Sequence, residues 1–152
     1  MKIAIGADHA GFDMKQDLAG YLARHGHEVI DLGTNSTAPV DYPDISEAVG
    51  EAVRGGQAER GIVVCGSGAG AAIAACKIPG IRASVCHDAY SARQAVEHDD
   101  LNVLCLGSRV IGPSLARTLA EAFLAATFSG AERHVNRVAK IRKIESRYSR
   151  ED

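Results

Sequence analysis

The stretch Ile62–Ala72, "IVVCGSGAGAA", places a cysteine between an apolar run and a glycine-rich turn. A short run of β-branched residues that is closed by glycine is typical of a buried strand, and the alanines after the turn favour a helix. The stretch therefore predicts a strand–turn–helix unit with Cys65 at the carboxyl end of the strand. The thiol is then either a core side chain or a group that faces a bound anion.

Short apolar runs of the same kind alternate with helical stretches along the whole chain. The expected strands are 2–6, 28–32, 61–65, 82–86 and 102–106, and the expected helices are 11–25, 43–55, 69–78, 89–98 and 113–128. Five such units predict the α/β class, as a Rossmann-like three-layer α/β/α sandwich with a five-stranded parallel sheet. We expect one domain over residues 1–152, ending in a basic helix at about 130–148, and right-handed crossovers favour the strand order 2-1-3-4-5.

This strand order predicts where a ligand binds. The first and third strands are neighbours at the switch point of the sheet, and ligands of such sheets bind outside the carboxyl ends of the strands there. Asp8 and His9 follow the first strand in "GADHAG", and Cys65 opens "CGSGAG" after the third. We therefore expect these two polar, glycine-flanked loops to face one crevice.

Composition excludes several classes of protein. The formal net charge of −2 gives no reason to expect nucleic acid or an anionic membrane as a partner. No run of 18 apolar residues occurs, and the amino terminus lacks the long apolar region of a signal peptide. The four cysteines form no CxxC pair, as expected for reduced thiols. We expect a cytoplasmic protein.

Cys65 differs from the other cysteines by its position before a turn of main-chain amides. Such amides favour a thiolate, and they can also hold an oxyanion that develops on a substrate. A thiolate beside an oxyanion hole suits acyl transfer, or abstraction of a proton from carbon next to a carbonyl. A buried strand-end thiol is the alternative, and we assign Cys76, Cys86 and Cys105 to that class.

Histidines and arginines add further candidates. His98 ends a predicted helix just before the fifth strand, and we expect it on the same rim as His9 and Cys65. Arg133 and Arg137 are spaced i,i+4 on one helical face, as a clamp on phosphate or carboxylate requires. A solvated basic helix is the alternative. No HxxxH, HExxH or paired Cys/His spacing occurs, so we expect neither a metal nor another cofactor.

Two other functions fit part of the sequence. Gly66-x-Gly68-x-x-Ala71 matches the dinucleotide fingerprint, but that motif normally follows the first strand of a larger nucleotide-binding fold. A cysteine-dependent hydrolase would need an acid or amide to orient a Cys–His pair, and it leaves the arginines of the tail unexplained. There is no GxxxxGK[ST] motif, which disfavours a Walker-type NTPase.

The assembled motifs resemble those of type B ribose-5-phosphate isomerases, a family that includes allose-6-phosphate and galactose-6-phosphate isomerases. They are "GADHAG", "VIDLGT", "DYPD", "CGSGAG", "EHDDLNVLCLGSR" and the basic tail, in that order over nearly the whole chain. The resemblance implies an intramolecular oxidoreductase of the pentose phosphate pathway. It would interconvert D-ribose 5-phosphate and D-ribulose 5-phosphate through a cis-enediolate, without a metal.

The resemblance also implies roles for individual residues. Cys65 matches the base that moves a proton between C2 and C1, and Ser67 matches a hydroxyl that assists proton transfer at the oxygens. The main-chain amides that match the hole for the enediolate oxygen run from Gly66 to Gly70 and include those of Gly68 and Ala69.

Further matches concern binding and ring opening. Asp8 and His9 match contacts to the sugar hydroxyls and the phosphate end, Tyr42 matches a pocket-lining tyrosine, and Arg109, Arg133 and Arg137 match ligand-side arginines. His98 matches the group that opens the furanose ring, a step that Asp8 could assist. In the family the counterparts of His98 and Arg109 reach the pocket from a neighbouring subunit, which implies a homodimer that could pair into a tetramer.

Asp99 departs from the family pattern, which often has asparagine after the ring-opening histidine. A carboxylate there loses the amide donor and adds negative charge near an anionic substrate. It leaves the proposed chemistry intact but leaves the sugar open between ribose 5-phosphate, allose 6-phosphate and a tetrose phosphate.

Overall fold

The computed structural model describes residues 1–149 and contains five strands and six helices within them. The strands are β1 (Lys2–Ala7), β2 (Glu28–Asp31), β3 (Arg60–Cys65), β4 (Ala83–Val85) and β5 (Val103–Gly107). The helices are α1 (Phe12–Arg24), α2 (Tyr42–Arg54), α3 (Ala69–Ala75), α4 (Ala89–Asp99), α5 (Pro113–Ala125) and α6 (Glu132–Tyr148). Among these residues no helix is both long and apolar enough to cross a membrane.

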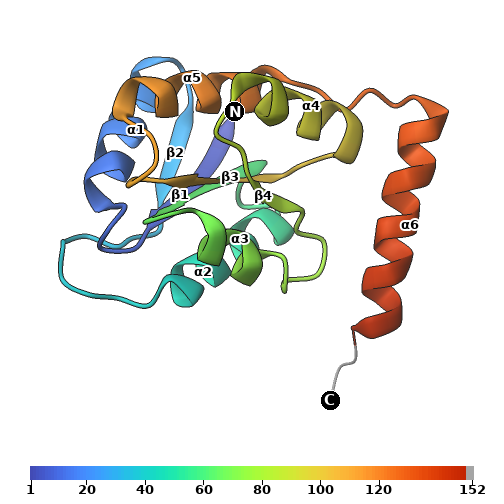
Figure 1. Cartoon of the computed structure of the whole chain (residues 1–152), viewed down its shortest axis with the longest axis horizontal. Coiled ribbons are helices and arrows are strands. Elements are labelled where there is room, and N and C mark those ends of the chain that lie inside the picture. The colour runs from blue at the N-terminus through green and yellow to red at the C-terminus, as the bar shows by residue number, and fades with distance from the viewer. Residues whose placement is uncertain (150–152) are drawn as a thin grey trace.

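The elements form three layers around a parallel sheet, as expected (Figure 1). Helices α1, α4 and α5 pack on one face, where a buried cluster includes Ile5, Leu18 and Phe123. Helices α2 and α3 cover the other face over a second cluster that includes Val49 and Val63. Because both faces of the sheet are covered, its strands are almost continuously apolar.

The expected order of the last two strands is wrong. The observed order is β2-β1-β3-β5-β4, so β5 lies inside the sheet and β4 at its edge. All five residues of β5 are buried, whereas the three residues of β4 are only half-buried and suit an edge. Since α3 and α4 cover opposite faces, right-handed crossovers carry the chain out to β4 and then back to β5.

The switch point between β1 and β3 is where the sequence predicts it. Ala7 pairs with Val64 at the carboxyl ends of the two strands, and the amide of Asp8 donates to the Val64 carbonyl at 3.2 Å. This pairing places the loops that follow β1 and β3 side by side at the carboxyl edge of the sheet.

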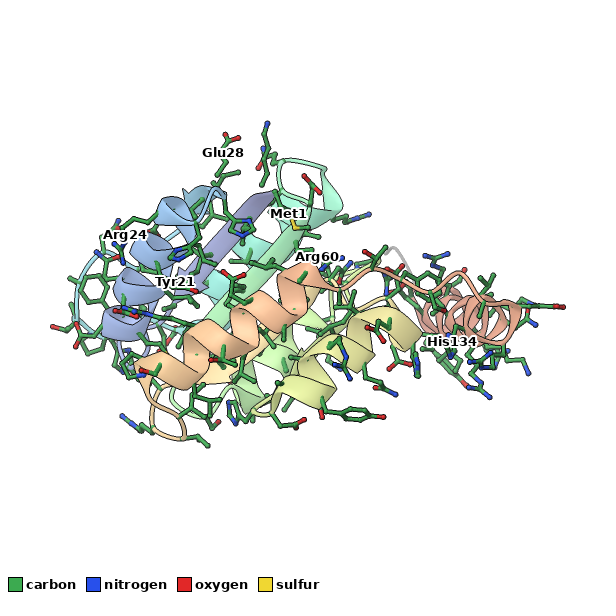
Figure 2. The ribbon with its side chains drawn as sticks, turned by 90° about the horizontal axis from the view of Figure 1, so that it is seen from above. Met1, Tyr21, Arg24, Glu28, Arg60 and His134 are labelled. Carbon is green, nitrogen blue, oxygen red and sulfur yellow. The ribbon has the colours of Figure 1, made fainter. Side chains whose placement is uncertain are left out.

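Helix α6 stands apart from the layers. Figure 2 shows it nearly end-on, beyond the edge of the sheet, with His134 at its junction with the rest of the molecule. Val138 is buried against the domain, but Ile141, Ile144 and Tyr148 are 44%, 54% and 76% exposed. Because so much of its apolar surface is exposed, this 17-residue helix is only weakly stabilised by packing against its own domain.

All four cysteines are free thiols. Burial raises the pKa of Cys86 and, much more strongly, that of Cys105, so both are inert core residues. The assignment of Cys76 to the core is wrong, because Cys76 caps the end of α3 and its side chain is exposed. Its thiol donates to the Ala83 carbonyl at 3.2 Å.

Candidate active site

A pocket of about 330 Å³ lies at the carboxyl ends of β1, β3 and β5. Its lining residues are Asp8, Tyr42, Cys65, Gly66, Ser67, Gly70, Arg109 and Val110. Sequence reasoning missed Val110, although its place next to Arg109 after a buried strand could have indicated it. The loops after β1 and β3 therefore share one crevice.

The sulfur of Cys65 lies at the inner wall of this pocket. The residue is only 4% exposed, and its Sγ accepts a hydrogen bond from the Gly68 amide at 3.1 Å. Gly68 has a φ of +83°, a left-handed conformation that glycine adopts without strain and that turns its amide toward the sulfur. The turn therefore fixes the position of the sulfur and directs a main-chain donor at it.

The turn also presents amides that an anion could use. Within residues 1–149, the amides of Gly66 and Ser67 have no protein acceptor, and both residues line the pocket. The amides of Gly68 and Ala69 are already engaged, by Cys65 Sγ and by Ser67 Oγ at 3.2 Å. The Gly70 amide likewise has no acceptor among the described residues, and Gly70 lines the pocket, so the amides of Gly66, Ser67 and Gly70 can receive an oxyanion.

Asp8 forms the wall opposite the turn. The residue is 7% exposed, and its Oδ1 accepts from the Gly11 amide at 3.1 Å, which leaves Oδ2 for a ligand. The adjacent His9 accepts from the Val40 amide through Nδ1 at 3.2 Å, so a neutral His9 carries its proton on Nε2. His9 lies beside the pocket and does not line it.

Arg109 lines the pocket of its own chain, which corrects the expectation that it arrives from a neighbouring subunit. The amide of Arg109 donates to the Gly66 carbonyl at 3.0 Å, and that of Ser108 donates to the Cys65 carbonyl at 2.9 Å. A Cβ at Gly107 would lie 2.6 Å from the Ser67 carbonyl carbon. Only glycine therefore lets the loop after β5 approach the turn after β3 so closely.

Tyr42 closes the pocket from the first turn of α2. Its ring packs on Gly70, where an added Cβ would lie 2.7 Å from ring carbons. The preceding loop is tied down by Lys15, which is fully buried and pairs with Asp31 at 2.8 Å and with the Thr34 carbonyl. Sequence reasoning missed this buried lysine, because its helical position alone does not separate it from a solvated one.

His98 lies far from this pocket, so the expectation that it shares a rim with Cys65 is wrong. A helix that joins two parallel strands leaves the carboxyl edge of the sheet and ends at the amino edge. His98 ends α4 in this way, and the next residues pair with the segment that precedes β4, where Arg82 Nε donates to the Asp100 carbonyl at 2.7 Å. Asp99 lies at the same edge and is exposed.

His98 belongs to a group of four residues at the contact of α4 with α6. They are Gln94, His98, Ser129 and His134. The rings of His98 and His134 stack with centroids 4.0 Å apart, and His134 Nδ1 pairs with Ser129 Oγ. Burial lowers the pKa of His134 first of all, and His98, Arg133 and Arg137 lower it further, while Asp99 raises it in part. Both arginines are exposed and contribute nothing to the pocket of their own chain.

Comparison with known proteins places the chain in a family. The sequence model of a family described as Ribose/Galactose Isomerase matches residues 3–141. The chain belongs to this family. Within the ribose/galactose isomerase family, ribose-5-phosphate isomerase B of Escherichia coli is 47% identical over 146 residues, which cover 96% of this chain and 97% of that protein.

Two further relatives are similar to the chain over most of their length. A D-erythrulose-4-phosphate isomerase of Pectobacterium atrosepticum is 43% identical over 132 residues and 86% of either chain. The structure of Clostridium thermocellum ribose-5-phosphate isomerase B superposes with a TM-score of 0.96 at 51% identity, over 98% of this chain and 100% of that one. The family's fold therefore extends over nearly the whole chain.

Proposed function

We propose that the chain interconverts D-ribose 5-phosphate and D-ribulose 5-phosphate, acting as one isomerase domain. The observation that carries this is the Cys65 sulfur lying in one pocket with the unpaired amides of Gly66 and Ser67 and with Asp8. Removing a proton from carbon next to a carbonyl needs a base and fixed donors for the new oxyanion, and this turn offers both.

The proposed steps balance around Cys65. Its thiolate takes the proton from C2 of the open-chain aldose, giving an enediolate whose oxygen the two amides hold, and the thiol returns that proton to C1. The O2 proton moves to O1, with Ser67 Oγ placed in the pocket to assist. Nothing in this scheme consumes a cofactor or a metal.

We propose further that two copies complete each other's pockets. His98, Asp99, Arg133 and Arg137 gather at the opposite edge of the sheet from Cys65, so they can serve a pocket only if that pocket belongs to another chain. The exposed apolar side chains of α6 are what a homodimer would bury. In such a dimer the two arginines grip the phosphate and align C1 and C2 against Cys65.

One assay tests this function. The protein is incubated with ribose 5-phosphate in EDTA, and kcat/KM is compared with that for allose 6-phosphate and erythrose 4-phosphate. We expect ketose to form fastest from ribose 5-phosphate and to be unaffected by the chelator. Absence of ketose from every sugar phosphate, together with measurable NAD binding, would instead favour the nucleotide-binding alternative.

A tetrose phosphate is the second candidate substrate. The relative named D-erythrulose-4-phosphate isomerase is almost as similar in sequence as the ribose-5-phosphate isomerase from Escherichia coli. A kcat/KM for erythrose 4-phosphate above that for ribose 5-phosphate would assign the tetrose.

We propose the cytoplasm as the location, since four free thiols suit a reducing compartment.

A further inference from the structure

We infer that Gln94 is a positioning residue for sugar-ring opening, because it determines which ring nitrogen of His98 carries the proton. This inference rests on the proposed function and its shared pockets, together with the role that the family resemblance implies for His98, which is to open the furanose in a neighbouring copy. It concerns a step that precedes the chemistry at Cys65 and is confined to substrates that form a ring.

The geometry holds His98 from two sides. The Gln94 side-chain nitrogen lies 2.9 Å from His98 Nδ1, one helical turn earlier on α4, and both side chains are half-buried. An amide that donates to Nδ1 requires a lone pair there, so the neutral ring carries its proton on Nε2. The His134 ring, itself held by Ser129, stacks on His98 and fixes the plane of the imidazole.

Ring opening needs a proton donor in a defined place. The C1–O4 bond breaks, C1=O1 forms, O4 gains a proton and O1 loses one. A base of the receiving pocket such as Asp8 can take the O1 proton and pass it to O4, while the Nε2–H of the neutral His98 donates a hydrogen bond that stabilises the negative charge developing on O4.

Several charged groups lie near His98, but its Nδ1 is contacted by a neutral side chain. His98 faces Gln94 on its own helix and His134 on α6, while Asp99 follows it and Arg133 and Arg137 flank His134. The carboxylate that precedes it in the chain is turned to another partner, since Glu97 Oε1 lies 3.6 Å from Arg93 Nε. Replacing Gln94 by a neutral residue therefore changes the tautomer of His98 without removing a charge.

The test compares a substrate that cyclises with one that cannot. Erythrose 4-phosphate has its C4 oxygen esterified and forms no furanose, whereas ribose 5-phosphate does. We expect Gln94→Met, which keeps the size but loses the hydrogen bond, to lower kcat/KM for ribose 5-phosphate by about 10-fold and to leave that for erythrose 4-phosphate unchanged. Gln94→Glu, whose carboxylate accepts from Nδ1–H, should lower it further and shift the acidic limb of the pH profile.

Two controls separate the ways in which this could fail. Arg93→Met alters the adjacent surface of α4 and should leave both substrates unaffected. His98→Ala should impair ribose 5-phosphate alone. If His98→Ala leaves ribose 5-phosphate turnover intact, the proposed role of His98 fails. If His98→Ala impairs it but both Gln94 variants match the unsubstituted protein in rate and pH profile, the positioning role of Gln94 fails while the proposed function survives.

Discussion

At the scale of single residues, the pocket is organised by contacts of the main chain with Cys65. The Gly68 amide points at the sulfur, and the Ser108 and Arg109 amides hold the carbonyls of Cys65 and Gly66. Cys65 is thus held by hydrogen bonds that do not depend on any other side chain. Removing its sulfur should leave the shape of the pocket almost unchanged.

Cys65→Ala therefore tests chemistry separately from binding. We expect kcat for ribose 5-phosphate to fall on the order of 10³-fold, because the base is lost, while binding of the sugar phosphate weakens little. Stopped assays and calorimetric titration measure the two quantities. Cys76→Ser, at an exposed thiol outside the pocket, is the matched control and should change neither. A large loss of affinity in Cys65→Ala would contradict the role of a base.

Gly70→Ala tests the pocket wall. The new methyl group would lie 2.7 Å from the Tyr42 ring, which is 41% exposed and free to turn away. We expect kcat/KM to fall about 10-fold through misplaced substrate, with little change in Tm. Gly20→Ala on α1, where a Cβ meets only the end of the Arg24 side chain, is the control and should keep full activity. An equal loss in both variants would show that the contact of Tyr42 with Gly70 does not shape the pocket.

At the scale of elements, the junction of α4 with α6 should respond to acid. The lowered pKa of His134 means that the unfolded chain binds a proton at a higher pH than the folded protein. The free energy of unfolding should therefore fall as the pH drops below about 6.5, until His134 is protonated in both states.

His134→Phe isolates this effect, since phenylalanine keeps a stacking ring but cannot titrate. Chemical denaturation at pH 7.5 and 5.5 should show a smaller loss of stability in the variant than in the unsubstituted protein. Equal losses would mean that His134 does not couple proton uptake to the docking of α6.

Local patterns predict the elements well but not how the last two strands are arranged. Short apolar runs closed by glycine, histidine or aspartate indicated all five strands, because strand formation depends on neighbouring residues. The order of β4 and β5 depends on which strand is buried on both sides. The fully apolar "VLCLG" and the half-exposed "ASV" indicated which strand lies inside the sheet and which lies at its edge. The prediction instead followed the general preference for the strand order 2-1-3-4-5.

The predicted site residues also fall into a group that local patterns placed correctly and a group that they did not. Asp8, Tyr42, Cys65 and Arg109 meet in one pocket because each follows or approaches the carboxyl end of a strand. His98 was misplaced because a residue just before a strand lies at the opposite edge. The link that we propose between the two edges comes from the family resemblance, because a pocket shared with a second chain cannot be derived from the local patterns of one chain.

At the scale of the whole molecule, the proposed sharing of pockets between two copies predicts complementation between inactive variants. In a mixed dimer of Cys65→Ala with Arg137→Ala, one pocket carries both defects and the other carries neither. Unfolding and refolding the two variants together should restore about a quarter of full activity, since half of the dimers are hybrids with one intact pocket. Each variant refolded alone is the control, and no recovery in the mixture would show that Arg137 acts within its own chain.

The insertion of β5 between β3 and β4 also affects how the protein is made. While the chain emerges from the ribosome, β4 has no strand to pair with, and the apolar edge of β3 is uncovered until residues 103–107 appear. The nascent chain thus carries an incomplete sheet with an unpaired apolar edge from the synthesis of β3 until that of β5. Stalled products that end before β5 should be prone to aggregation and quickly degraded. The complete sheet should assemble only after synthesis has passed that strand.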